Sequence, residues 1–193
     1  MSVVSIAEAW PATSRPFTVT DLDRMPDDGR RYELIDGVLI VSPGPAIPHQ
    51  EAVGELNFLL RQVRPRGFRV LPDPTMHASE LTELRPDLVV ARYEDVQGAR
   101  KLTKPPLLVV EVQSPSTAMF DLNTKKVVYE RLGIASYWIV VPDPDAPELI
   151  VYELSGGRYE QVAHVTGKEA FRAELPFPVE VIPARLVAGL FPD

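Results

Sequence analysis

The sequence predicts a mixed α/β fold in which helices cover a central β-sheet. Short apolar runs rich in β-branched residues, at 107–110 and 136–141, are typical of buried strands. Two longer segments, 49–63 and 121–132, repeat apolar residues every three to four positions, as amphipathic helices do. The 193 residues, 45% hydrophobic and 24% charged, suit one globular domain with a single core.

Composition excludes several classes of protein and site. The chain has no cysteine, which excludes disulfides, thiolate catalysis and cysteine-ligated metals. The three histidines, His49, His77 and His164, lie far apart, so a histidine-rich zinc site is not expected. No apolar run approaches the roughly 20 residues that cross a bilayer, and the N-terminus lacks the basic segment of a secretory signal. We therefore expect a cytoplasmic protein without a membrane partner, with residues 1–16 as an N-terminal arm of a domain that spans 1–193.

The net charge of −7 argues against a protein that coats nucleic acid through bulk electrostatics. A local basic groove remains compatible with this charge. Basic residues cluster at Arg61, Arg64, Arg66 and Arg69, and again at Arg100, Lys101 and Lys104. We interpret both clusters as solvated surface.

The first half of the chain carries clear signals for a helix start and a hairpin. Thr18 or Asp21 is a suitable cap for a short helix that ends near 26–29. Asp36-Gly37 is the dipeptide favoured in two-residue turns, because both central residues need a positive φ. It separates predicted strands at 31–35 and 38–42. The other predicted elements are a helix at 49–63, strands at 68–71, 75–78, 87–91 and 107–111, a helix at 121–132, strands at 136–141, 148–154, 158–165 and 177–182, and a short helix at 183–190.

Two carboxylates mark the ends of predicted core strands. The strand at 107–111 ends on Glu111, and the strand at 87–91 begins with Asp87. An ionised acid in a core costs several kcal/mol unless it is paired or holds a metal. If the two strands are antiparallel neighbours and the chain folds back near residues 98–99, these two acids lie side by side. Adjacent carboxylates repel unless a cation or a shared proton intervenes, and Mg²⁺ is a suitable cation.

The helix predicted at 121–132 brings a lysine toward these acids. Asp121, Lys125, Val128, Tyr129 and Leu132 share one stripe at steps of three and four. Lys125 therefore faces inward with the packing residues and points back toward Glu111. Asp121 is either an acid favoured at a helix N-terminus or a residue that orients Lys125. Tyr129 is interpreted as a packing residue that orients Lys125.

Several of these motifs together resemble the Uma-two family, a bacterial family of predicted restriction endonucleases in the PD-(D/E)XK nuclease superfamily. The resemblance covers about 32–142, and its motifs occur in the family's order. They are Tyr32-Glu33-Leu34-Ile35-Asp36-Gly37, Pro48-His49, Arg85-Pro86-Asp87-Leu88-Val89-Val90, Val110-Glu111-Val112 before Ser114-Pro115-Ser116-Thr117, Asp121 with Lys125 and Tyr129, and Gly133 before Tyr137-Trp138-Ile139-Val140.

The resemblance implies a restriction-endonuclease-like αβββαβ core and a metal site. In that superfamily Asp87 and Glu111 would bind a divalent cation, Mg²⁺ or Mn²⁺, and Glu33 would complete the site or serve as a cross-strand partner. The catalytic lysine normally follows the second acid by two residues, where this chain has Gln113. Lys125 matches the place to which the family's lysine has moved, and Gln113 is left as a neutral ligand or a group that orients water.

The implied activity is endonucleolytic hydrolysis of DNA by a homodimer, with 136–141 or the C-terminal hairpin as candidate interfaces. His49 is a candidate for contacting a phosphate or assisting proton transfer, against the simpler role of a residue at a helix start. Two other hypotheses about the function remain open. The protein could be a catalytically silent dimeric module that retains the fold, or a nuclease directed at RNA or at particular nucleic-acid structures.

Overall fold

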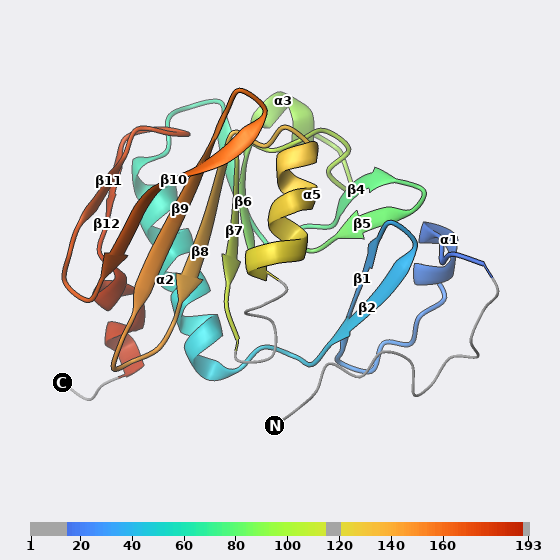
Figure 1. Cartoon of the computed structure of the whole chain (residues 1–193), viewed down its shortest axis with the longest axis horizontal. Helices are drawn as coiled ribbons and strands as arrows, with labels where there is room; N and C mark the ends of the chain where they lie inside the picture. Colours follow the sequence, from blue (N-terminus) through green and yellow to red (C-terminus); the bar gives the residue numbers. More distant parts are fainter. Residues whose placement is uncertain (1–14, 115–120, 191–193) are drawn as a thin grey trace.

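The structure is a computed structural model, and it describes residues 15–114 and 121–190. Its strands form a large sheet, a small sheet beside it and a two-stranded ribbon (Figure 1). The large sheet has the order β10 (Arg158–Thr166), β9 (Glu148–Ser155), β8 (Ser136–Val141), β7 (Leu108–Val112), β6 (Leu88–Arg92) and β3 (Phe68–Pro72). The small antiparallel sheet has the order β2 (Val38–Ser42), β1 (Arg31–Ile35), β5 (Thr82–Leu84) and β4 (Met76–Ser79), and the ribbon pairs β11 (Phe171–Ala173) with β12 (Val179–Val181).

The predicted mixed α/β architecture is confirmed, but the strands divide between sheets instead of sharing one. The predicted strands at 68–71 and 75–78 became β3 and β4, which belong to different sheets. Between them the chain turns at Asp73, whose φ is 47°. Asp73 stands between Pro72 and Pro74, and proline cannot donate to a strand ladder while aspartate tolerates a positive φ. This tripeptide therefore ends one strand and redirects the chain. The unpredicted β5 and β11 complete the small sheet and the ribbon.

Two helical segments cover opposite faces of the large sheet (Figure 1). Helix α2 (Ile47–Val63) begins two residues before the predicted start, because Pro48 is acceptable in a first helical turn. The predicted helix at 121–132 is a π-helical turn, η1 (Asp121–Lys125), followed by α5 (Lys126–Arg131). Even-numbered apolar residues of β6 and β7 pack in one core cluster with α2, and odd-numbered ones pack in a second cluster with α5. This division follows from the alternation of side chains along a strand.

Strands β7 and β8 are parallel neighbours, and this explains where α5 lies. Parallel strands need a crossover connection, usually a helix that packs on the sheet. Here the connection carries η1 and α5. It therefore brings Lys125 and Tyr129 over the face of the sheet to which Glu111 belongs.

The predicted antiparallel register of β6 and β7 is confirmed. Leu88 pairs with Val110 and Val90 pairs with Leu108. Asp87 directly precedes β6, and the backbone N–H of Val112 donates to its carboxylate. Strand pairing therefore brings Asp87 to the end of β7 that carries Glu111.

Other local predictions are confirmed with small shifts. The hairpin of β1 and β2 turns at Asp36-Gly37 with φ values of 48° and 81°. The remaining helical segments are α1 (Val19–Leu22) with its Thr18–Asp21 capping box, the unpredicted α3 (Tyr93–Val96), and η2 (Pro183–Leu190). The suggestion that 136–141 forms a dimer interface is wrong, because β8 is buried between β7 and β9. In the described ranges no helix is long and apolar enough to cross a membrane.

Candidate active site

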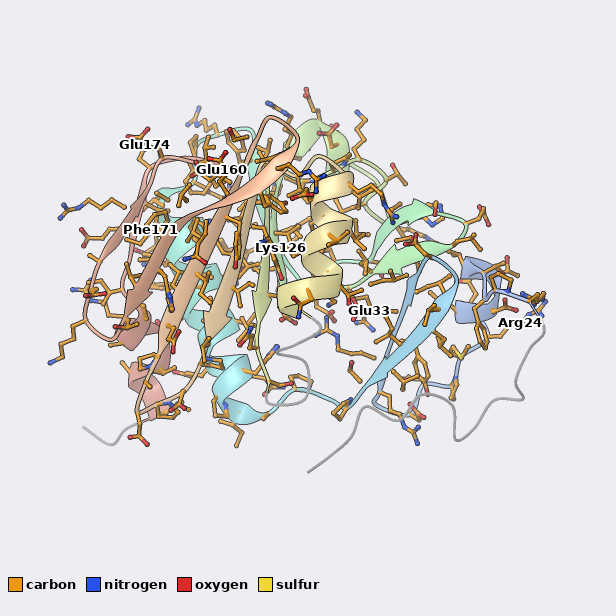
Figure 2. All side chains as sticks on the ribbon, in the orientation of Figure 1. Arg24, Glu33, Lys126, Glu160, Phe171 and Glu174 are labelled. Carbon is orange, nitrogen blue, oxygen red and sulfur yellow. The ribbon has the colours of Figure 1, made fainter. Side chains whose placement is uncertain are left out.

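Lys125 lies between two carboxylates from different sheets. Its Nζ is 3.1 Å from Oε1 of Glu33 on β1 and 3.0 Å from Oε1 of Glu111 on β7. The three side chains are only 3–5% exposed. Figure 2 shows Glu33 between the small sheet and α5, which is the side from which it reaches Lys125. The backbone N–H of Arg85 donates to the same oxygen of Glu33 at 2.8 Å. One buried ammonium thus joins the small sheet, the large sheet and the crossover helix.

Asp87 is held from three directions. Nη1 of Arg31, on β1, lies 2.5 Å from Oδ1 of Asp87. On the other oxygen, Oδ2, the backbone N–H of Val112 donates at 2.7 Å and Nε2 of His49 lies 3.1 Å away. Nε2 is the donor in this contact, since an ionised carboxylate only accepts. Arg31 also donates to the carbonyl oxygen of Arg85.

The electrostatic surroundings favour the ionised form of Asp87. Burial would by itself raise the pKa of this carboxyl. The hydrogen bond from His49 and the positive charge of Arg31 outweigh burial and hold the pKa of Asp87 well below its usual range. For Arg31, burial alone would lower the pKa, but the charges of Asp87 and Glu33 raise it. The pair is therefore a charged pair throughout the physiological range.

Tyr129 binds the acid that Lys125 also binds. Its hydroxyl donates to Oε1 of Glu111 at 2.5 Å, and the side chain is fully buried. Burial, followed by the negative charge of Glu111, raises the pKa of Tyr129 well above its ordinary value. The hydroxyl thus remains a donor, and it fixes the orientation of Glu111. This is a more direct role than the packing role that the sequence suggested.

The other predicted site residues are placed as follows. His49 lies in the first turn of α2 and contacts Asp87, and within the described residues its Nδ1 has no hydrogen-bond partner. Gln113 follows β7 directly, is buried and donates its backbone N–H to Val140, but its Nε2 has no partner among the residues that the structure describes. Asp121 begins η1, and its side chain lies outside the described ones, as does the loop at 115–117.

A groove of about 400 Å³ opens beside Asp87. Its lining includes Arg31, His49 and Asp87 together with Val53 and Gly54 of α2. Of the acid cluster, Asp87 lines this groove, whereas Glu33, Glu111 and Lys125 are not among its lining residues.

The acids supply oxygen ligands, which Mg²⁺ prefers, but basic groups separate them. Lys125 lies between Glu33 and Glu111, and Arg31 pairs with Asp87. Accordingly, no group of three His, Asp or Glu side chains in the described part of the chain is arranged to hold a metal ion. Mg²⁺ commonly uses only one or two carboxylates and completes its shell with water and substrate phosphates. Glu111 on β7 and Asp87, which directly precedes β6, are the two carboxylates that this mode would use.

Arg31 is a site residue that the sequence interpretation missed. It stands two residues before Glu33 on β1, and alternation puts both side chains on one face of the strand. That spacing was the available signal.

The second basic cluster, at Arg100, Lys101 and Lys104, is separate from this site. Lys101 pairs with Glu83, and Lys104 pairs with Asp95.

Comparisons with known proteins identify the family and the fold. A family model described as "Uma2: Putative restriction endonuclease" matches residues 19–186. A crystal structure from Anabaena variabilis ATCC 29413, described as "a putative nuclease belonging to DUF820", is similar with a TM-score of 0.71 and 18% sequence identity, over 91% of this chain and 100% of that chain. At that identity the similarity concerns the fold. No curated protein matches the chain significantly.

Proposed function

The chain belongs to the Uma2 family of "putative restriction endonucleases", and from this membership we propose that it is a divalent-metal-dependent endonuclease that hydrolyses DNA phosphodiester bonds. One observation carries the proposal. Three acids that are far apart in the sequence, Glu33, Asp87 and Glu111, converge with Lys125 in a single buried cluster beside an open groove. Isolated buried charges are costly, so such a cluster in a nuclease-like fold indicates a site that handles charge.

Asp87 and Glu111 would hold the cation, Mg²⁺ or Mn²⁺. When bound, the cation would act as a Lewis acid that lowers the pKa of a water and offsets phosphate charge. Lys125 would stabilise negative charge that develops on the phosphoryl oxygens, because its ammonium is already dehydrated and fixed by two carboxylates. Glu33 positions Lys125, and Tyr129 positions Glu111.

The test is cleavage of supercoiled, linear and single-stranded DNA with Mg²⁺ or Mn²⁺, alongside RNA. We expect cleavage that requires the cation and is lost in Lys125→Ala and Asp87→Ala. Lys126→Ala is the matched control, since the neighbouring Lys126 lies on α5 with its Nζ 3.9 Å from the centre of the Tyr152 ring (Figure 2). Cleavage that is unchanged in Lys125→Ala would exclude this lysine from the mechanism.

The alternative of a silent interaction module predicts a different outcome. Such a protein would neither cleave nucleic acid nor bind Mn²⁺, and its ionic cluster would serve stability alone. Preferential cleavage of RNA or of a branched DNA would instead retain the chemistry and change the substrate. Pairing of two copies, so that two sites address two strands, is a further prediction that light scattering tests.

A further inference from the structure

Arg31 occupies the carboxylate that the proposed function assigns to the metal. Its guanidinium contacts Oδ1 of Asp87 at 2.5 Å, and its side chain is 17% exposed. A second nitrogen of the same group lies 3.5 Å from Oδ1 of Asp73. A cation that binds Asp87 must therefore compete with Arg31 or move it.

The net charge of the buried cluster shows how favourable it is to bind a divalent cation, a phosphodiester or both. With the acids and Lys125 ionised and His49 neutral, the cluster contains three carboxylates and two cations, Arg31 and Lys125, which leaves one net negative charge. A divalent cation alone would turn this into one net positive charge beside a buried guanidinium. A phosphodiester alone would add a second negative charge. Only the two ligands together leave the cluster neutral, and burial makes uncompensated charge costly.

The groove gives a phosphate access to the same guanidinium. Arg31 and His49 both line it, next to Asp87. Arg31 also has spare donor capacity, since its Nε has no hydrogen-bond partner within the described parts of the chain. A neutral His49 has a single N–H, on Nε2, which donates to Asp87 and is released when a cation takes that carboxylate. Arginine suits this task because its planar fork binds carboxylate and phosphate in the same way.

We propose that Arg31, assisted by His49, is a binding site for one phosphodiester of the substrate, and that it leaves Asp87 for this phosphate when a divalent cation takes Asp87. This inference rests on the proposed function and adds to it that the cation and the nucleic acid bind cooperatively. The cation binds weakly to the free protein, and cation and nucleic acid each tighten the binding of the other. Thermodynamic linkage requires the two enhancements to be equal.

The experiment is a Mn²⁺ titration of the full chain, followed by electron paramagnetic resonance, with and without a short oligonucleotide of hydrolysis-resistant phosphorothioate linkages. In the unmodified protein the oligonucleotide should tighten Mn²⁺ binding by about tenfold or more, on the order expected for one unit charge at close range. Arg31→Met should bind Mn²⁺ more tightly than the unmodified protein when the oligonucleotide is absent. In this variant the oligonucleotide should tighten Mn²⁺ binding only slightly further.

Arg85→Met is the matched control. It removes the same charge close to the site, but the Arg85 guanidinium pairs with the half-exposed Asp73 and not with Asp87. It should behave as the unmodified protein does. If the oligonucleotide tightens Mn²⁺ binding equally in Arg31→Met and in the unmodified protein, the proposed role of Arg31 is wrong. The nuclease proposal would still stand. If no protein binds Mn²⁺, the nuclease proposal fails and this inference fails with it.

A second measurement needs no variant, in case Arg31→Met does not fold. The unmodified protein is titrated with Mn²⁺ in the presence of a methylphosphonate oligonucleotide of the same sequence, whose linkages are uncharged. The enhancement should disappear. An enhancement as large as that with the charged oligonucleotide would show that the coupling does not involve phosphate charge, and would overturn the inference.

Discussion

Replacing Lys125 with methionine tests whether the buried cluster depends on its central ammonium. The Nζ of Lys125 lies 3.1 and 3.0 Å from two carboxylate oxygens, and all three side chains are almost fully buried. At an effective dielectric constant of about 20, each contact corresponds to an attraction of roughly 5 kcal/mol, most of which offsets the cost of burying the charges. Removing one partner from such a pair typically costs about 3–5 kcal/mol. We expect Lys125→Met to lower the free energy of unfolding by that amount at neutral pH.

The loss should shrink as the pH falls. Without the ammonium, Glu33 and Glu111 face each other as like charges, and a proton taken up from solution can replace the missing cation. The double variant Lys125→Met/Glu33→Gln should recover much of the loss at neutral pH for the same reason. Urea denaturation of the three proteins at acid and neutral pH measures both effects.

Lys104→Met is the control for a surface ion pair. Lys104 contacts Asp95 at 2.6 Å, a shorter distance than either contact of Lys125, but its side chain is 67% exposed. Water screens such a pair, so its loss should change stability little. If Lys125→Met is no more destabilising than Lys104→Met, or if its effect does not depend on pH, burial of the cluster does not control its energetics and the reasoning is wrong.

Four further substitutions probe the acid pair and the backbone, each by denaturation. The pKa of Asp87 lies below the ordinary value of 3.8, so its stabilising contribution is present above that pH and is lost as the pH falls through the lower folded value. Asp87→Asn should therefore lower stability at neutral pH and reduce the loss of stability in acid. Tyr129→Phe removes a buried donor to Glu111 and should cost about 1–3 kcal/mol, and ultraviolet titration of the unmodified protein should show no ionisation of Tyr129 before unfolding, because burial raises its pKa well above 10.0. Gly54→Ala should stabilise α2 by about 0.5–1 kcal/mol since no atom lies within 4 Å of the added Cβ, whereas Gly37→Ala should destabilise the hairpin, where φ is 81°. A destabilising Gly54→Ala would show that this wall of the groove is tighter than the structure indicates.

Local patterns in the sequence predicted most of the elements and part of the site. The hairpin around Asp36-Gly37, the strand at 136–141 and the helical stripe through Lys125 and Tyr129 all match the structure, because each depends on turn chemistry or side-chain period within one segment. The neighbouring positions of Asp87 and Glu111 also followed from the sequence, once an antiparallel register with a turn near 98–99 was assumed.

Division of the strands between sheets could not be predicted in the same way. Strand β5 has only three residues and no alternation long enough to recognise, and it is a strand because β1 and β4 flank it. The suggested interface at 136–141 failed for a related reason. An apolar strand has the same sequence whether it lies in the middle of a sheet or at an exposed surface.

By itself, then, the sequence determined the kinds of element, the turn at Asp36-Gly37 and the positions of the acids along the chain. The tertiary structure alone decided which cation neutralises which acid. Arg31 and Glu33 both project from β1, yet Arg31 binds Asp87 while Glu33 binds Lys125. That choice depends on how the small sheet packs against the end of the large one, and contacts between segments 50 or more residues apart leave no local period in the sequence.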